Sequence, residues 1–334
     1  MFENLFPQFF LKTLERVPLE KVGEIRLRLN KKIVLSIGNK SYYLSSNGLT
    51  GNGASALTAD RLLIDDVFKR ACENSVYAYA DQIKNGFITT KGGIRIGLAG
   101  EGVYEKNYLK TLKNIDSLSI RIPHQINGCA LQIMNYLFDN EFLNTLIIAP
   151  PGAGKTTLIR DILLTLSQKN YCYNVLLVDE RFEIANCFNG EPTLDVGNFC
   201  DILSGIKKDY AFENGIRALR PDIIATDELS PEDYPAVQYA VSCGVSILAS
   251  IHAKNIDDLR LKDSFETILK NKIFKRYIVL SSREGPGTIE NIYDENFRVI
   301  NYWWNFFWYA LCLFVFLWLA LKLQIFIEKR KIFM

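Results

Sequence analysis

The stretch that decides the fold is NTLIIAPPGAGKTTL, residues 144–158. Its apolar run Leu146–Ala149 predicts a short buried strand, and the spacing of leucine and isoleucine after Thr156 predicts a helix, so a small and flexible loop joins the two. Backbone N–H groups in such a loop, together with the N-terminus of the following helix, attract anions. The stretch therefore predicts a loop that binds the phosphates of a nucleotide, in preference to a glycine-rich turn without a ligand.

The residues of this loop predict ATP and Mg²⁺ as its ligands. Gly152 and Gly154 let the backbone fold around a phosphate. We expect Lys155 to reach the β- and γ-phosphates and Thr156 to offer its hydroxyl to Mg²⁺. Ala149 stands where the pattern usually has its first glycine, but it ends the strand and does not wrap the phosphate. The predicted nucleotide-binding residues are Pro151, Gly152, Ala153, Gly154, Lys155, Thr156 and Thr157.

The composition of the chain is that of a globular protein. It has 334 residues, 49% hydrophobic and 23% charged, which is enough for two domains. A formal net charge of +2 argues against a protein that mainly coats nucleic acid. The seven cysteines form no CxxC pair and there are two histidines, so the sequence predicts neither a disulfide framework nor a zinc site. Residues Met1–Val17 predict an amphipathic helix and not a signal peptide.

Residues 1–122 predict an α+β domain, and residues 123–128 a linker. Alternating apolar and polar residues over Val22–Leu29 predict a half-buried strand, and further short apolar runs follow it. Thr58 is placed to cap the helix after it, with Leu62 on the apolar side of that helix.

From residue 129 to 298 the pattern changes to alternating strands and helices, which is typical of a parallel sheet. A helix is expected over about 130–138, before the phosphate loop. Three later buried strands end in polar residues, which are Asp179 with Glu180, Asp227 with Glu228, and His252. Such strand ends lie at the ligand-binding edge of a parallel α/β sheet.

These strand ends supply what transfer of a phosphoryl group to water requires: a held Mg²⁺, a group that orients the water and a sensor of the γ-phosphate. Asp227 is placed to hold Mg²⁺, usually through water. Either Glu228 or Glu180 is placed to orient or deprotonate the nucleophile, and His252 to donate to the γ-phosphate. The alternative for each acid is a solvated strand end or a helix cap, and for the histidine a buried, hydrogen-bonded ring.

Three segments resemble the stage III sporulation protein AA family: VDERFEIA at 178–185, RALRPDIIATDE at 217–228 and SIHA at 250–253. The strings EIRLR at 24–28 and GGIRIGLAG at 92–100 resemble the same family, so the likeness covers about residues 15–295. That family is similar in turn to the traffic ATPases of type II and type IV secretion and of type IV pili. Their motor domain carries an Asp box, a Walker B segment and a His box in this order.

The resemblance implies a RecA-like P-loop motor domain of the α/β class, with a mostly parallel sheet, after a smaller α+β domain. It implies Glu180 as the catalytic glutamate of the Asp box, Glu228 as the Walker B glutamate and His252 as the His-box residue. It also implies a homo-hexamer with the nucleotide between subunits. The chain departs from the family at Ala149 and Phe182, and neither is one of the proposed catalytic groups.

The function that the resemblance implies is an ATP-hydrolysing motor. It would energise assembly of, or transport through, a secretion-like channel between mother cell and forespore during endospore formation. Membrane channel proteins would be its partners, and it would work at the inner face of the cell membrane from the mother-cell cytoplasm.

The tail at 299–327 is a further departure from the family pattern. Val299–Leu321 carries no charged residue, and a run of about 20 apolar residues is long enough to span a bilayer. We expect a hydrophobic C-terminal helix that associates with the membrane, with its aromatic residues at the headgroups. Basic residues after it oppose a single span, so a helix in the interface, a re-entrant segment or burial against other subunits are the alternatives.

Two other functions stay open. Relatives of this motor fold translocate DNA, so a nucleic-acid-associated P-loop ATPase is the alternative, although the near-neutral charge argues against nucleic acid as a partner. A scaffold that binds ATP and hardly turns it over is the third. Arg217 and Arg220 either reach the nucleotide or pair with nearby acids, and Arg26, Arg28 or Arg95 either form strand surface or reach a nucleotide in a neighbouring subunit.

Overall fold

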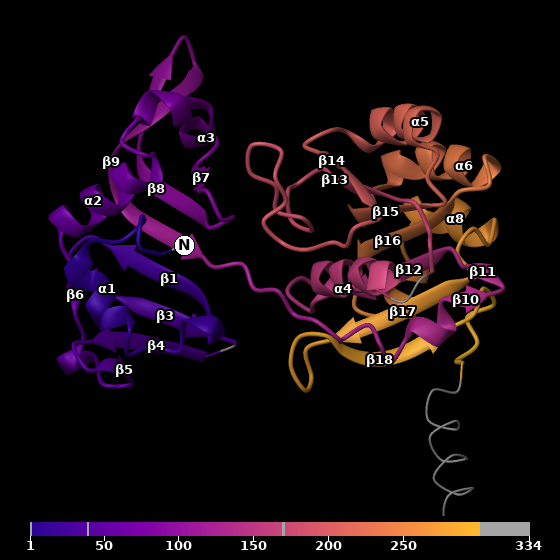
Figure 1. Cartoon of the computed structure of the whole chain (residues 1–334), viewed down its shortest axis with the longest axis horizontal. Coiled ribbons are helices and arrows are strands. Elements are labelled where there is room, and N and C mark those ends of the chain that lie inside the picture. The colour runs from indigo at the N-terminus through magenta and orange to yellow at the C-terminus, as the bar shows by residue number, and fades with distance from the viewer. Residues whose placement is uncertain (1, 39, 169–170, 301–334) are drawn as a thin grey trace, which may run out of the picture. The chain divides into compact units, whose positions relative to one another are not determined.

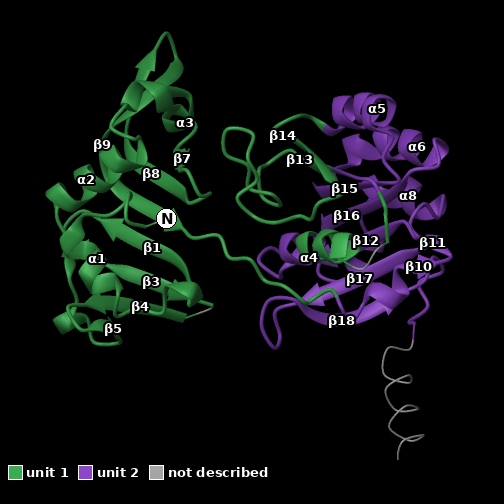
Figure 2. Ribbon diagram, in the orientation of Figure 1, with its two compact units in different colours: residues 1–130, 160–173, 177–207 green, residues 131–159, 174–176, 208–334 purple. Residues whose placement is uncertain are grey.

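The computed structural model describes residues 2–38, 40–168 and 171–300 (Figure 1). The chain divides into two compact units (Figure 2). The boundary between them passes through one helix, α4 (Lys155–Gln168), and one strand, β13 (Val175–Asp179). Unit 1 comprises Met1–Ala130, Arg160–Tyr173 and Leu177–Lys207, and unit 2 comprises Leu131–Ile159, Asn174–Leu176 and Lys208–Met334.

Unit 1 contains an antiparallel sheet of seven strands in the order β5-β4-β3-β1-β9-β8-β7. One face of this sheet is apolar, because Ile25 and Leu27 of β1 and Leu118 and Ile120 of β9 are fully buried while the residues between them are not. The strands are β1 (Val22–Arg28), β3 (Val34–Ile37), β4 (Lys40–Ser45), β5 (Gly48–Thr50), β7 (Phe87–Thr89), β8 (Arg95–Glu105) and β9 (Tyr108–Arg121), with a separate pair β2 (Lys31–Lys32) and β6 (Thr58–Ala59).

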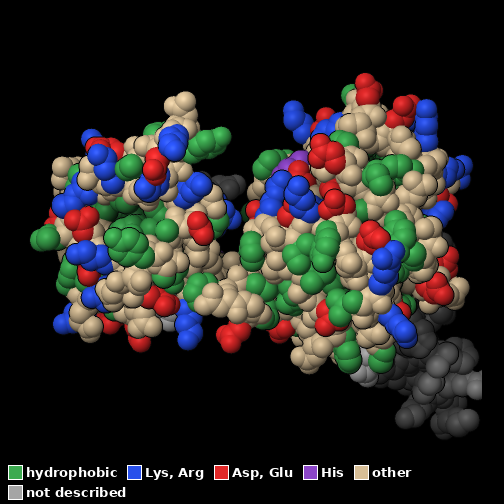
Figure 3. Space-filling model, turned by 90° about the horizontal axis from the view of Figure 1, so that it is seen from above, with side chains coloured by type: hydrophobic (Ala, Val, Ile, Leu, Met, Phe, Trp, Pro, Cys, Tyr) green, Lys and Arg blue, Asp and Glu red, His purple; other side chains and the backbone are tan. Residues whose placement is uncertain are grey.

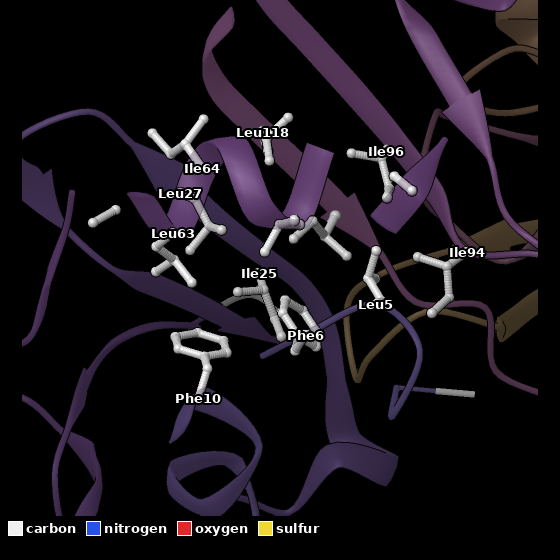
Figure 4. Packing of buried hydrophobic residues seen from close by; sticks show 14 of the residues in the cluster. Leu5, Phe6, Phe10, Ile25, Leu27, Leu63, Ile64, Ile94, Ile96 and Leu118 are labelled. Atoms are coloured by element: carbon white, nitrogen blue, oxygen red, sulfur yellow. The ribbon is translucent and has the colours of Figure 1, made fainter. Parts of the chain in front are cut away.

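Helices pack on the apolar face of this sheet. Figure 4 shows Phe6 and Phe10 from the N-terminal segment, Leu63 of α2 and Ile25 of β1 in one buried cluster. The predicted N-terminal helix is shorter than expected, because Pro7 stands directly before its first residue. The helices of this part are α1 (Gln8–Leu14), α2 (Arg61–Ala71) and α3 (Ala80–Lys84).

The cap of α2 is Asp60, so the prediction of Thr58 was wrong. The Asp60 carboxylate accepts a hydrogen bond from the Leu63 N–H at 2.8 Å. Thr58 lies instead in β6, whose pairing with β2 holds its backbone extended. Aspartate is at least as good a cap as threonine. Leu62, predicted on the apolar side, is 79% exposed.

The second sheet also has seven strands, in the order β14-β13-β15-β16-β12-β17-β18. Strand β12 pairs in parallel with β16 and β17, β15 pairs in parallel with β16, and β18 pairs antiparallel with β17. All five residues of β12 are buried, as expected for a parallel strand covered on both faces. The strands besides β13 are β12 (Thr145–Ala149), β14 (Cys200–Ser204), β15 (Ile223–Glu228), β16 (Ser246–His252), β17 (Arg276–Ser281) and β18 (Thr288–Tyr293).

Helix α4 follows β12 as the sequence predicted, and its apolar residues Leu158, Ile159, Ile162 and Leu163 are buried. Ser230 and Asp233 form a capping box directly before α6. The remaining helices are α5 (Lys208–Leu219), α6 (Tyr234–Ser242), α7 (Ile256–Arg260) and α8 (Glu266–Lys270).

The helix predicted over 130–138 does not form. Only a single turn of 3-10 helix, Met134–Tyr136, occurs there, followed by the two-residue strand β10 (Phe138–Asp139), which pairs with β11 (Glu141–Phe142). The apolar spacing was read correctly, since Ala130 and Ile133 are buried. The short segment is tied at one end by the Asp161 carboxylate, which accepts from the Ala130 N–H at 2.6 Å, and at the other by the hairpin.

Sheets and helices in alternation confirm the predicted α/β class. Within the described part of the chain, no helix combines the length and the apolar composition that a bilayer span needs. The tail predicted at 299–327, with its hydrophobic helix, lies outside the described residues from 301 onward.

Candidate functional site

The predicted phosphate loop joins β12 to α4 and is built on glycines in the left-handed region. Gly152 has φ +74° and Gly154 has φ +90°, a backbone conformation that L side chains rarely adopt. A Cβ on Gly154 would lie 2.9 Å from the Gly287 nitrogen, in the turn between β17 and β18. The Gly287 N–H donates to the Ala153 carbonyl at 3.0 Å. The loop therefore rests on a second backbone turn that admits no side chain at Gly154.

Lys155, the first residue of α4, is turned back over the end of β12. Its Nζ donates to the carbonyl oxygens of Ala149 at 3.2 Å and Pro150 at 3.3 Å, and lies 2.7 Å from Nδ1 of His252. The parallel register pairs Ala149 with His252, so β12 and β16 end side by side. The predicted phosphate lysine and the predicted His-box residue are thus in direct contact.

His252 also contacts Glu228. Its Nε2 lies 3.0 Å from Oε2 of Glu228. An ammonium group can only donate, so Nδ1 of the ring accepts from Lys155, and in the neutral ring Nε2, which faces the carboxylate, carries the proton. Three of the predicted residues, from three different elements, therefore form one continuous chain of polar contacts.

Asp227 takes part in a buried ion pair. Its Oδ1 lies 3.2 Å from Nζ of Lys208, the first residue of α5, and both side chains are 5% exposed. Lys208 Nζ is also 3.8 Å from Oδ2 of Asp233, which in turn accepts from the Ser230 N–H. Oδ2 of Asp227 is buried and accepts no hydrogen bond from the residues that the structure describes. One oxygen of the Asp227 carboxylate is therefore paired with lysine, while the other is buried and accepts no hydrogen bond from the described residues.

Glu180 follows the last residue of β13 in unit 1. The Asp179 carboxylate before it is fully buried and accepts hydrogen bonds from the backbone N–H groups of Glu183, Ile184 and Ala185. Phe182 adopts φ +57°, so the chain turns sharply two residues after Glu180. Asp179 therefore serves as the anchor of the turn that presents Glu180.

Arg160 of α4 contacts the same turn from the other side. Its Nε donates to the Ile184 carbonyl at 2.6 Å and its Nη2 to the Glu183 carbonyl at 2.9 Å. Burial lowers the pKa of the Arg160 guanidinium from its ordinary value, and the neighbouring Asp179 charge opposes that shift. Arginine stays charged under such a perturbation.

Sequence reasoning missed Arg160 and Lys208 as contributors to the site, and it placed Asp179 at a strand end without assigning it a role. The signal available in the sequence was a charged residue at a position that the apolar pattern predicts to be buried. Arg160 lies on the buried side of α4 between Ile159 and Ile162, and Asp179 ends an otherwise apolar strand. Charged residues are almost never fully buried unless they are paired, so such positions predict an internal partner.

The donor atoms at this site are oxygens, which suits Mg²⁺. Thr156 supplies a hydroxyl at the second position of α4, and the open Oδ2 of Asp227 is a carboxylate oxygen. No cluster of three histidine, cysteine or acidic residues that could enclose a metal occurs among the described residues. Mg²⁺ typically uses one or two protein ligands and completes its shell with phosphate oxygens and water, so the residues fit this ion.

Comparison with known proteins gives one family. The family model described as "Sporulation stage III, protein AA" matches residues 8–300. The chain is 34% identical over 305 residues to stage III sporulation protein AA of Bacillus subtilis (strain 168), covering 89% of this chain and 96% of that protein.

Among solved structures, the chain is similar to the ATPase DotB. The Legionella pneumophila DotB aligns with a TM-score of 0.56 and 13% identity, covering 82% of this chain and 76% of that one. The Yersinia pseudotuberculosis DotB aligns with a TM-score of 0.50 and 14% identity, covering 78% and 71%. At such identities the likeness is one of fold.

Proposed function

Because the chain belongs to the sporulation stage III protein AA family, we propose that it is an ATP-hydrolysing motor that acts during endospore formation. The observation that supports this most directly is the chain of contacts from Lys155 through His252 to Glu228. It joins a phosphate-loop lysine to a strand-end carboxylate, and the fold shared with an ATPase agrees with it. We assign the second sheet and its helices to a RecA-like ATPase domain.

In this proposal the backbone of the phosphate loop and Lys155 bind the β- and γ-phosphates of ATP. Lys155 exchanges two carbonyl oxygens and the His252 ring for phosphate oxygens, which frees Nδ1 of that ring. Glu228 or Glu180 orients the attacking water, and His252 faces the γ-phosphate. Catalysis of this kind depends on fixed charges and donors around the γ-phosphoryl group.

We propose that Mg²⁺ binds with the nucleotide, held by Thr156 and, through water, by Asp227. Bound there, the ion would neutralise charge on the phosphate oxygens. Lys208 limits the charge that Asp227 brings to the site, since one of its oxygens is already paired.

We further propose a homo-oligomer, a hexamer by its resemblance to secretion ATPases, with membrane channel proteins as partners at the cytoplasmic face of the membrane. The apolar sequence of the tail at 299–327 is the feature of this chain that supports association with a membrane. In this proposal the partners form a secretion-like channel between mother cell and forespore. ATP turnover by the motor energises either the assembly of this channel or transport through it.

The first test is phosphate release by the purified full chain, with Lys155→Ala as the blank. We expect turnover that depends on Lys155 and on Mg²⁺ and that is indifferent to single-stranded DNA. Removal of the ammonium group deprives the phosphates of their main side-chain contact, so the variant should be inactive while its thermal unfolding stays close to that of the native chain. Strong stimulation by DNA would favour a nucleic-acid motor, and no turnover would favour a scaffold.

The two glutamates are distinguished by Glu180→Gln and Glu228→Gln. Loss of a residue that orients or deprotonates the nucleophile lowers kcat by about 10²–10⁴-fold. We expect Glu180→Gln to do this and to retain bound ATP, which is read by filter binding of labelled ATP. Unchanged turnover in Glu180→Gln together with loss in Glu228→Gln would assign the catalytic role to Glu228.

A further inference from the structure

The turn after Glu180 is held between two buried charges of opposite sign. Asp179 Oδ1 accepts from the Glu183 N–H at 2.8 Å, and its Oδ2 accepts from the Ala185 N–H at 2.9 Å. The Ile184 N–H lies 3.1 Å from both oxygens. Arg160 donates to the carbonyl oxygens of Glu183 and Ile184. The N–H groups of this turn therefore face the carboxylate, and its carbonyl groups face the guanidinium.

The chain is fixed on the other side of Glu180 as well. The Asp179 carbonyl accepts from the N–H groups of Gly205 at 3.1 Å and Phe182 at 3.3 Å. A Cβ on Gly205 would lie 2.7 Å from the Phe182 ring, so this ring packs directly on the glycine backbone. Glu180 and Arg181 thus form a two-residue segment that is anchored at both ends, by Asp179 and by Phe182.

Arg160 connects this segment to helix α4. It lies five residues after Lys155, which is about 7.5 Å along the helix axis. Residue Arg160 is 4% exposed, and its guanidinium donates hydrogen bonds to two carbonyl groups of the turn. A planar guanidinium with two parallel donors fixes direction as well as distance, which a lysine cannot reproduce.

We propose that Arg160 is a positioning residue for Glu180: it ties the helix that begins at the phosphate lysine to the turn that fixes the orientation of Glu180. This rests on the function proposed above, in which Glu180 acts on the nucleophile. Arg160 reaches the reaction through the peptide groups of Glu183 and Ile184 and does not touch the nucleotide. Asp179 completes the clamp by accepting hydrogen bonds from the backbone N–H groups of the same turn.

A positioning role and a purely structural role predict different kinetics. If the clamp orients Glu180, its loss lowers kcat and leaves the binding of ATP nearly unchanged, because the phosphate loop is intact. A misplacement of a catalytic group by about 1 Å costs up to about a hundredfold in rate. If Arg160 only supports the core, damage to α4 should affect nucleotide affinity and kcat together.

The experiment compares Arg160→Lys and Arg160→Gln with the native full chain. The matched control is Arg70→Lys, since Arg70 is partly exposed and pairs with Asp66 on the surface of α2. Three kinds of measurement are made: steady-state kinetics, which give kcat and KM for ATP; binding of a fluorescent ATP analogue; and hydrogen exchange of the amides of Glu183, Ile184 and Ala185. Arg160→Lys keeps the charge and one donor, so it tests the geometry even if Arg160→Gln fails to fold.

We expect Arg160→Lys to lower kcat by about tenfold to a hundredfold, with KM and analogue affinity within about threefold, and to speed exchange of the three amides. The control should change none of these. Unchanged kcat with faster exchange, or a parallel loss of kcat and affinity, would overturn the positioning role. If the native chain shows no Lys155-dependent turnover, the proposed function fails, and exchange alone then decides whether Arg160 holds the turn.

Discussion

At the scale of single residues, Lys208 is a buried cation between two acids. Its Nζ lies 3.2 Å from Asp227 and 3.8 Å from Asp233, and its side chain is 5% exposed. Taking such charges out of water costs free energy, and this cost is offset only while each charge has its partner of opposite sign. Removal of the lysine would therefore lower the stability of the fold strongly, because it leaves the Asp227 charge buried and unpaired with Lys208 beside the proposed site.

The cost of burying the Asp227 charge without its lysine can be measured with Lys208→Met. The substitution keeps the length of the side chain and removes its charge, so it should lower the free energy of unfolding by about 3–5 kcal/mol. Urea denaturation followed by circular dichroism measures it. The control Arg217→Met removes a surface ion pair and should cost about 1 kcal/mol or less. A loss in Lys208→Met no larger than in the control would mean that Asp227 is solvated or protonated there.

The residues of the site were predictable to different degrees. Lys155, Glu228 and His252 lie at loop and strand ends, where the pattern of apolar runs marks them, and the structure brings these three together. Lys208 is 19 residues from Asp227, and its partner is set by how α5 packs on the sheet. No local pattern encodes such a pairing. The same holds for Arg160, whose partners are backbone carbonyl groups.

At the scale of elements, the turn between β7 and β8 meets the segment that follows the Glu180 turn. The Asn186 side chain donates to the Gly93 carbonyl at 2.7 Å and to Thr193 Oγ1 at 2.9 Å. A Cβ on Gly93 would lie 2.0 Å from Nδ2 of Asn186 and 2.2 Å from Oγ1 of Thr193. Only glycine fits there, both for space and because its φ is +80°.

The chain offers a matched pair to test this contact. Gly86 has φ +79° and nothing within 4 Å of its would-be Cβ, so Gly86→Ala carries only the backbone cost of about 1–2 kcal/mol. Gly93→Ala carries the same cost and also displaces Asn186, so it should lose about 1–3 kcal/mol more. Chemical denaturation of both variants gives the difference. Equal losses would show that Asn186 moves aside without penalty.

Elements were predicted best where one strong pattern covers the whole of them. Strand β12 and helix α4 agree with their predicted positions because a fully apolar run and a helical apolar face bound the loop between them. The region 130–138 has helical spacing but forms a 3-10 turn, since its ends are tied by Asp161 and by the β10-β11 hairpin. The paired ends of strands β8 and β9 consist largely of exposed residues, which lack an apolar signal in the sequence.

At the scale of the whole molecule, charge is balanced. The formal net charge is +2, and Lys, Arg, Asp and Glu side chains are interspersed over the face seen in Figure 3. A mixed surface of this kind does not act as a long-range attractor for a polyanion. This agrees with our expectation that DNA does not change the rate of ATP turnover.

Coordination between subunits can be tested by mixing the native chain with Lys155→Ala. In a closed ring whose sites act in turn, one subunit that cannot bind phosphate delays its neighbours. We therefore expect activity to fall more steeply than the fraction of native subunits, so that an equal mixture retains clearly less than half of the native rate. The loss should develop with incubation time as subunits exchange between oligomers. Mixing with Arg70→Lys, a surface change on α2, should cause no loss. A strictly linear decrease with Lys155→Ala would mean that each subunit hydrolyses ATP by itself, and the proposed coordinated hexamer would be wrong.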